Sequence, residues 1–230
     1  KDLGNLQEAE VYTRKAIDLN PNFANAYSNL GIILKDLGNL QEAEVYTRKA
    51  IELNPDFANA YFSLGNILSD LDKSKEAEFS YRRAIDINPN FANAYCNLGN
   101  ILIELGNLKE AELYMRKAIE LNPDFADAYL NLGNVLKDLG NLQEAELSYI
   151  KAIELNPNFS IAYFSLSTLK LTNADNTWRD NLFSKNLLNN KSPKDKVNIY
   201  FAKANILHKE SNFKESSKYL QLANYLKQKL

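Results

Sequence analysis

The chain has 230 residues, of which 45% are hydrophobic and 24% charged, and its 27 Lys and Arg nearly balance its 29 Asp and Glu. A net charge of −2 excludes a strong overall field for nucleic acid or an acidic membrane, so neither is an expected partner. One cysteine, Cys96, and one histidine, His208, exclude a disulfide framework and a Cys- or His-based metal site, so we expect no metal and no cofactor.

Glycine and proline recur every 34 residues along most of the chain. The chain has 8 Gly and 6 Pro, which is roughly half the average usage of each. Five prolines and all the glycines follow this spacing: Pro21, Pro55, Pro89, Pro123 and Pro157; Gly31, Gly65, Gly99 and Gly133; Gly4, Gly38, Gly106 and Gly140. Such a period indicates a solenoid, in which each unit buries its apolar face by stacking on neighbouring units.

The period divides residues 1–173 into repeats, which we number from position 1 at Ala24. A partial repeat, 1–23, begins at the twelfth position, so we expect the natural protein to continue upstream. The complete repeats are 24–57, 58–91, 92–125 and 126–159. We expect the first helix of a further repeat over 160–173.

Each repeat is predicted to contain two helices, because its apolar residues recur at helical spacing on both sides of a central turn. In the repeat 24–57, Gly38 stands where a helix end favours a left-handed residue. We expect Asn39 to cap the second helix in a capping box with Glu42. Asp72 takes the place of the turn glycine in the next repeat, so we expect the turn there to be the least regular.

Small residues are predicted to face each other within each helix pair. Gly31 on the first helix and Ala43 on the second have equivalents every 34 residues. We expect these residues to let the two helix backbones approach closely.

The regular pattern ends at Ser167, which replaces the glycine of the first helix. We expect residues 174–195, rich in Asn and Lys, to be an insertion that Trp178 anchors to the solenoid. Residues 196–230 are predicted to form a degenerate helix pair that acts as a C-terminal cap.

These residues resemble the tetratricopeptide repeat, a helix–turn–helix unit with a large residue, Leu-Gly, an aromatic or Leu, two Ala and a closing Pro. In the first complete repeat the matching residues are Tyr27, Leu30, Gly31, Leu34, Ala43, Ala50 and Pro55. The resemblance covers residues 1–166. It implies an all-α fold, a right-handed α-solenoid of stacked antiparallel helix pairs, with the first helices lining a concave groove.

In this family, positions 2, 5, 6, 9, 12 and 13 point into the groove, and here positions 6 and 9 are rich in asparagine. An asparagine side chain offers a donor and an acceptor, so a row of them can bind the backbone of an extended peptide. The row is similar to one that binds substrate backbone in O-linked N-acetylglucosamine transferases. The candidate groove residues are Asn29, Asn66, Asn97, Asn100, Asn131, Asn134, Phe62, Leu130, Phe164, Lys35 and Lys137.

The residues at the groove positions also allow two other interpretations. The amides are also consistent with a solvated surface in an Asn-rich chain. A clamp for a terminal carboxylate is disfavoured, because position 5 carries no basic residue. Cys96, at position 5, is expected to face the groove as a plain small residue.

The function expected from these features is a scaffold that binds a protein or peptide in its groove and is not an enzyme. The absence of a long apolar run and of a signal peptide predicts no membrane span and favours a cytoplasmic, bacterial protein. Two alternatives remain open. Residues 199–224 resemble the helix pair that precedes the catalytic domain in bacterial tetratricopeptide-linked sulfotransferases, which implies a substrate-recruiting arm of a larger transferase. Exposed apolar residues on the partial repeat would instead favour self-association.

Overall fold

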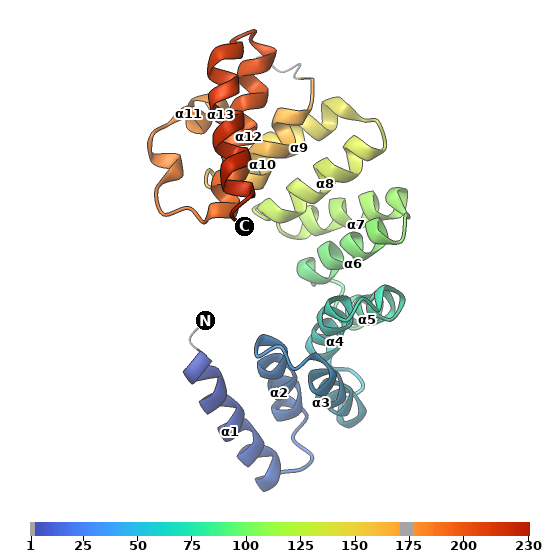
Figure 1. Cartoon of the computed structure of the whole chain (residues 1–230). Coiled ribbons are helices and arrows are strands. Elements are labelled where there is room, and N and C mark those ends of the chain that lie inside the picture. The colour runs from blue at the N-terminus through green and yellow to red at the C-terminus, as the bar shows by residue number, and fades with distance from the viewer. Residues whose placement is uncertain (1–2, 171–176) are drawn as a thin grey trace. The chain divides into compact units, whose positions relative to one another are not determined.

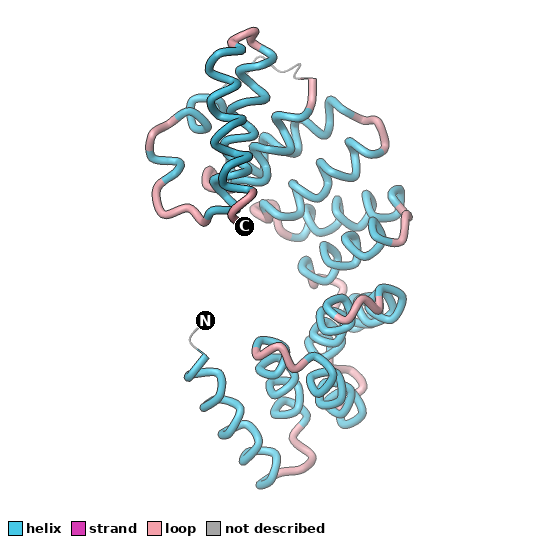
Figure 2. Tube along the Cα trace, viewed as in Figure 1, coloured by secondary structure: helices cyan, strands magenta, loops and turns pink. Residues whose placement is uncertain are grey.

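The computed structural model describes residues 3–170 and 177–230, in which all regular secondary structure is helical (Figures 1 and 2). The chain is an all-α solenoid, as the period predicts. It divides into two compact units, Lys1–Leu121 and Asn122–Leu230. Residues 171–173 of the expected first helix and 174–176 of the expected insertion lie outside the described residues.

In the first unit, the first and second helices of successive repeats alternate along the chain. They are α1 (Leu3–Leu19), α2 (Ala24–Asp36), α3 (Leu40–Leu53), α4 (Ala58–Asp70), α5 (Ser74–Ile87), α6 (Ala92–Glu104) and α7 (Leu108–Leu121). Helices α2, α4 and α6 each pack on the helix that follows, and α4 also contacts both α2 and α6. The first helices of three repeats therefore lie side by side and form one continuous surface.

The turns inside the repeats share one hydrogen-bond pattern, a Schellman motif. Gly38, at φ 85°, donates its N–H to the carbonyl of Lys35 over 2.9 Å, and the N–H of Asn39 reaches Leu34 over 2.8 Å. Asp72 adopts φ 57° and makes the same pair of bonds. Aspartate tolerates the left-handed conformation, so the turn keeps its hydrogen bonds. Leu71, just before it, lies at φ −94° and ψ 8°, outside the helical region that Leu37, Leu105 and Leu139 occupy, so this turn is the least regular of the four, as predicted.

The predicted capping boxes are absent where the structure describes the caps. The side chains of Asn39 and Asn141 make no cap hydrogen bond to the helices that follow them. The expectation was wrong at these two positions, where the N–H groups of Asn39 and Asn141 close the Schellman motif of the preceding turn. A side-chain cap does occur at Asn212, whose side chain accepts from the N–H of Glu215.

The helices approach closely at the first-helix glycines, but the group opposite each glycine is a side chain. A Cβ on Gly65 would lie 2.5 Å from the ring of Tyr81, and one on Gly31 would lie 2.1 Å from Oγ1 of Thr47. The alanines at the Ala43 position are fully buried. The glycine therefore makes room for the residue at position 24 of the same repeat.

The second unit begins with a regular pair and then departs from the repeat. Its elements are α8 (Ala126–Asp138), α9 (Leu142–Leu155), α10 (Ser160–Thr168), α11 (Thr177–Phe183), the 3₁₀ helix η1 (Asn186–Leu188), α12 (Pro193–Lys209) and α13 (Phe213–Lys227). Helix α12 packs on both α10 and α13, and α11 contacts α9 and α12. Trp178 on α11 is 4% exposed.

Helix α12 starts inside the segment expected as insertion, and its cap ties it to α10. Ser192 Oγ accepts from the N–H of Asp195 over 3.1 Å, and Pro193 occupies the first turn, where no N–H is needed. The hydroxyl of Ser160 on α10 donates to the carboxylate of Asp195 over 2.5 Å. At the other end of α10, Lys209 Nζ donates to the carbonyl of Ser167 over 2.6 Å.

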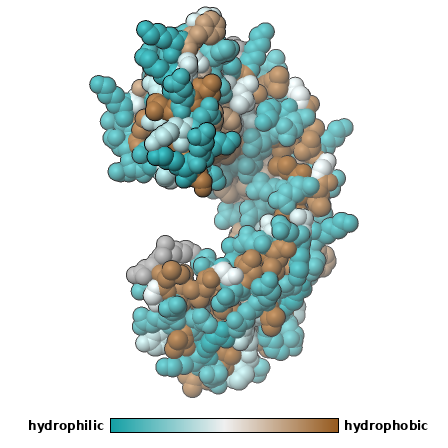
Figure 3. All heavy atoms as spheres, viewed as in Figure 1, coloured by the Kyte–Doolittle hydropathy of each residue, from teal (hydrophilic) through white to brown (hydrophobic). Residues whose placement is uncertain are grey.

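The face of the molecule seen in Figure 3 is largely hydrophilic, with apolar side chains in smaller groups between polar ones. In the part of the chain that the structure describes, no helix is long and apolar enough to cross a bilayer.

Substituting Gly65 by Ala should lower the free energy of unfolding by about 1–3 kcal/mol, because the new methyl group overlaps the Tyr81 ring. Urea unfolding measures the change. Asn59→Ala, an exposed substitution on the same helix, is the control and should have little effect. Equal stability of Gly65→Ala and the wild type would contradict the close contact.

Asp195 should make the free energy of unfolding depend on pH in the acid range. Hydrogen bonds, first from Ser160 and then from Ser192, hold its pKa below the ordinary value of 3.8. The ionised carboxylate therefore contributes its full stabilisation of the fold above pH 3.8, and this stabilisation is lost as the pH falls through the lowered pKa. Urea unfolding across the acid range should show a shallower loss of stability for Asp195→Asn than for the wild type. Parallel curves would exclude the effect.

Candidate functional site

Two adjoining hollows lie on the first helices of the first unit. One, of about 480 Å³, is lined by Asn29, Lys35, Phe62 and Asn66 among others. The other, of about 270 Å³, is lined by Lys35 and Asn66 together with Asn97 and Asn100. Because both hollows share Lys35 and Asn66, we treat them as one groove, the first-helix groove.

Aromatic rings form the apolar part of the first-helix groove. The ring centroid of Phe62 lies 4.7 Å from that of Phe91 and 5.9 Å from that of Tyr81. Phe57 and Phe91 line the larger hollow and were not predicted. They occupy position 34, just before a first helix, and the recurrence of phenylalanine there was the available signal.

The first-helix groove carries mixed charge, because Lys35 shares the lining with the carboxylates of Asp36, Asp70 and Glu104. Lys35 Nζ lies 2.9 Å from the carboxylate of Asp70 on the next repeat. This ion pair leaves no isolated cation of the kind that grips a terminal carboxylate.

At the centre of the groove, one amide oxygen accepts two hydrogen bonds. The hydroxyl of Tyr81 donates to Oδ1 of Asn66 over 2.8 Å, and Nδ2 of Asn97 donates to the same oxygen over 2.8 Å. Burial raises the pKa of Tyr81 above its ordinary value of 10.0, so its hydroxyl remains a donor at neutral pH. We call these three residues the Tyr81 amide cluster.

The Tyr81 amide cluster fixes the direction of the amides that the sequence predicted. The oxygen of Asn66 accepts both bonds, and among the described residues its NH₂ group and the amide oxygen of Asn97 make no hydrogen bond. The second unit contains a related bond, from the hydroxyl of Tyr149 to Oδ1 of Asn134 over 2.9 Å. Sequence reasoning missed these bonds because the tyrosine and the asparagine are 15 residues apart on different helices.

Position 5 was predicted to point into the groove, but most of its residues are buried. Cys96 is 2% exposed and Leu130 is 7% exposed, so neither is an open groove residue. Phe164 is half-buried, and its ring centroid lies 6.1 Å from that of Phe201 on α12. Ser28 and Phe62, also at position 5, nevertheless line the larger hollow, so the role of this position in binding stays a prediction.

Asn131, Asn134 and Lys137 lie on α8 in the second unit, outside the first-helix groove, and their proposed role in binding stays a prediction. Within residues 3–170 and 177–230, no group of three or more His, Cys, Asp or Glu side chains is placed to hold a metal ion.

The fold defines a helical repeat protein whose first helices line a groove. Residues 24–57, 58–91 and 126–159 match one profile of the tetratricopeptide repeat, and residues 1–23 and 92–125 match a second. These matches extend over more than half of the chain. The chain therefore belongs to the tetratricopeptide repeat family, whose members are generally scaffolds without catalytic activity.

Solved structures support the same fold. The chain is similar to MamA, with 28% identity and a TM-score of 0.62 over 67% of this chain and 90% of that one. It is also similar in fold to YrrB, described as a TPR protein with an unusual peptide-binding site, at 24% identity and a TM-score of 0.63 over 86% and 97% of the two chains. The third is PilF of Pseudomonas aeruginosa, at 22% identity and a TM-score of 0.68 over 88% and 91%.

No curated protein sequence matches this chain. The resemblance of residues 199–224 to sulfotransferase-linked helices is not shown by any of the matches.

Tyr81→Phe should lower the free energy of unfolding by about 0.5–1.5 kcal/mol, because Asn66 loses one of its two donors while the buried ring stays. Tyr149→Phe should have an effect of similar size. Tyr12→Phe is the control, since Tyr12 is 61% exposed. If Tyr81→Phe unfolds at the same urea concentration as the control, the hydroxyl bond does not stabilise the fold.

Proposed function

We propose that the chain is a protein-interaction scaffold without catalysis of its own, and that its first-helix groove binds an extended peptide segment of a partner protein. The observation that carries the proposal is the Tyr81 amide cluster, which lies where the two hollows meet. A fixed amide loses little conformational entropy on binding, so its hydrogen bonds contribute more to affinity.

The polarity of the cluster suits a peptide backbone. The NH₂ group of Asn66 would donate to a backbone carbonyl, and the amide oxygen of Asn97 would accept from a backbone N–H. Neither bond depends on the side chains of the peptide. Backbone recognition of this kind binds many sequences, as expected for a scaffold.

Selectivity would come from the two ends of the groove. Phe57, Phe62 and Phe91 offer an apolar surface for one large side chain of the peptide. The Lys35–Asp70 pair offers no net charge, so a peptide terminus with a free carboxylate should gain no advantage. The peptide-binding site named for YrrB is consistent with a peptide ligand in this fold.

The proposal predicts that Asn66→Ala combined with Asn97→Ala weakens peptide binding at least tenfold, because about two backbone hydrogen bonds are lost. Peptides selected on the full chain from a random library would be measured by calorimetry. Asn141→Ala, at an exposed asparagine that makes no cap hydrogen bond and is not a candidate groove residue, is the control and should retain wild-type affinity.

Two outcomes would overturn the proposal. One is that the selected peptides bind the double variant as tightly as the wild type. The other is that the Asn141→Ala control loses as much affinity as the double variant, so that the loss is not specific to the groove.

A further inference from the structure

The order of two adjacent residues on the second helix differs between repeats. The repeat 24–57 has Tyr46 at position 23 and Thr47 at position 24, whereas the repeat 58–91 has Ser80 followed by Tyr81. One residue corresponds to about 100° around a helix. Tyr81 is therefore turned to the first-helix groove, and the place that a tyrosine holds at position 23 is left to a serine.

The surroundings of Tyr46 show what a tyrosine at position 23 contacts. Its ring stacks on Tyr27 with centroids 6.1 Å apart. Tyr46 and Ile17 pack against a buried cluster that contains Leu30 and Leu34.

A guanidinium binds the hydroxyl of the tyrosine at position 23. Arg14 Nη1 of the preceding repeat donates to the hydroxyl of Tyr46 over 2.8 Å. The repeat 92–125 has the same arrangement: Tyr114 lies 5.8 Å from Tyr95, and its hydroxyl accepts from Arg82 Nη1 over 2.7 Å.

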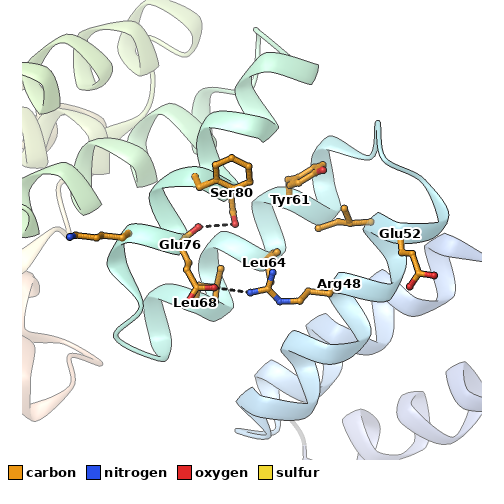
Figure 4. A pocket seen from close by; sticks show the side chains of 10 residues that line it. Arg48, Glu52, Tyr61, Leu64, Leu68, Glu76 and Ser80 are labelled. Atoms are coloured by element: carbon orange, nitrogen blue, oxygen red, sulfur yellow. Dashed lines mark hydrogen bonds and ion pairs between the residues drawn. The ribbon is translucent and has the colours of Figure 1, made fainter.

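In the repeat 58–91 the equivalent residues surround a hollow of about 500 Å³ between α3, α4 and α5 (Figure 4). Tyr27, Ile17, Leu30, Leu34 and Arg14, which lie around Tyr46, have their counterparts 34 positions later in the lining: Tyr61, Ile51, Leu64, Leu68 and Arg48. We call it the Ser80 hollow. The volume falls in the range of small-ligand sites.

Ser80 does not fill the hollow. Its hydroxyl donates to the backbone carbonyl of Glu76 over 2.9 Å (Figure 4). Phe79, at 63% exposure, adds an aromatic ring to the lining. The guanidinium of Arg83 lies 5.7 Å from the centre of the Tyr61 ring.

Arg48 is held in the same way as the two arginines that bind a tyrosine. Its Nη2 donates to Glu44 and Glu76, both over 2.8 Å, and its Nε donates to Glu44 over 3.1 Å. Arg14 uses its Nε and Nη2 for Glu10 and Glu42 in the same manner. Arg48 Nη1 makes no hydrogen bond with any residue of 3–170 or 177–230, so the position that would meet a phenol hydroxyl is open.

We infer that the Ser80 hollow is a binding site for a phenol ring, supplied by a tyrosine side chain of a partner protein. The ring would pack against Tyr61 over the apolar floor of Leu64 and Leu68, as Tyr46 packs in its own repeat. The hydroxyl would accept from Arg48 Nη1. This site lies on the second-helix side and is independent of peptide binding in the first-helix groove.

N-acetyl-tyrosinamide and N-acetyl-phenylalaninamide are the probes that test the inference on the full chain. In a nuclear magnetic resonance titration, the tyrosine compound should shift the amide signals of the lining residues saturably. The phenylalanine compound should bind about tenfold more weakly, because it cannot meet the guanidinium. Equal binding of both compounds would overturn the role of Arg48, and the absence of saturable shifts would overturn the site.

Ser80→Tyr places the missing ring inside the hollow and should abolish binding of N-acetyl-tyrosinamide while raising the melting temperature. Ser217→Tyr, at an exposed position of α13, is the matched control and should bind as the wild type does. Unchanged binding by Ser80→Tyr would overturn the inference. Asn66→Ala should leave binding of the tyrosine compound intact, which separates this site from the groove.

The converse variant, Tyr46→Ser, should open an equivalent hollow beneath Arg14 and Tyr27. The expected result is a second binding site for N-acetyl-tyrosinamide on the same chain. Circular dichroism would verify that the variant is folded. A folded variant that retains a single site would contradict the equivalence of the two repeats.

Discussion

The contact between position 8 on the first helix and position 24 on the second governs how each repeat presents its surface. Gly65 has no side chain, so the ring of Tyr81 can cross the helix pair and bring its hydroxyl to Asn66. A larger residue at position 8 would close this path. The direction of the amides in the groove, and therefore what a ligand meets there, depends on a glycine that no ligand touches.

Successive repeats in the first unit are joined by a row of ion pairs on their second helices. Arg14, Arg48 and Arg82 each bind a glutamate four residues earlier and another in the next repeat. These pairs are partly exposed, so each contributes roughly 0–1 kcal/mol. Their larger effect is geometric, because the two glutamates hold each guanidinium in place beside position 23 of the next repeat.

The helix pairs followed from the period, because the positions of glycine, proline and apolar residues recur every 34 residues. The pairs of Glu44 with Arg48 and Glu78 with Arg82 were also evident from their spacing along one helix. The amide cluster was not, because Tyr81 meets Asn66 and Asn97 only after the helices pack. The caps could not be predicted from spacing either. Asn39 and Asn212 both close the preceding turn with their N–H groups, but only the side chain of Asn212 also caps the helix that follows.

The order of Ser80 and Tyr81 has a consequence for how such an array diversifies. Transposing two neighbouring residues moves one phenol from one side of a helix pair to the other, without inserting or deleting any part of the chain. The same exchange opens a hollow on the side that the ring leaves. Because each repeat contacts mainly its neighbours, the exchange is local. A series of nearly identical repeats can thus carry different combinations of filled and receptive sites on a constant backbone.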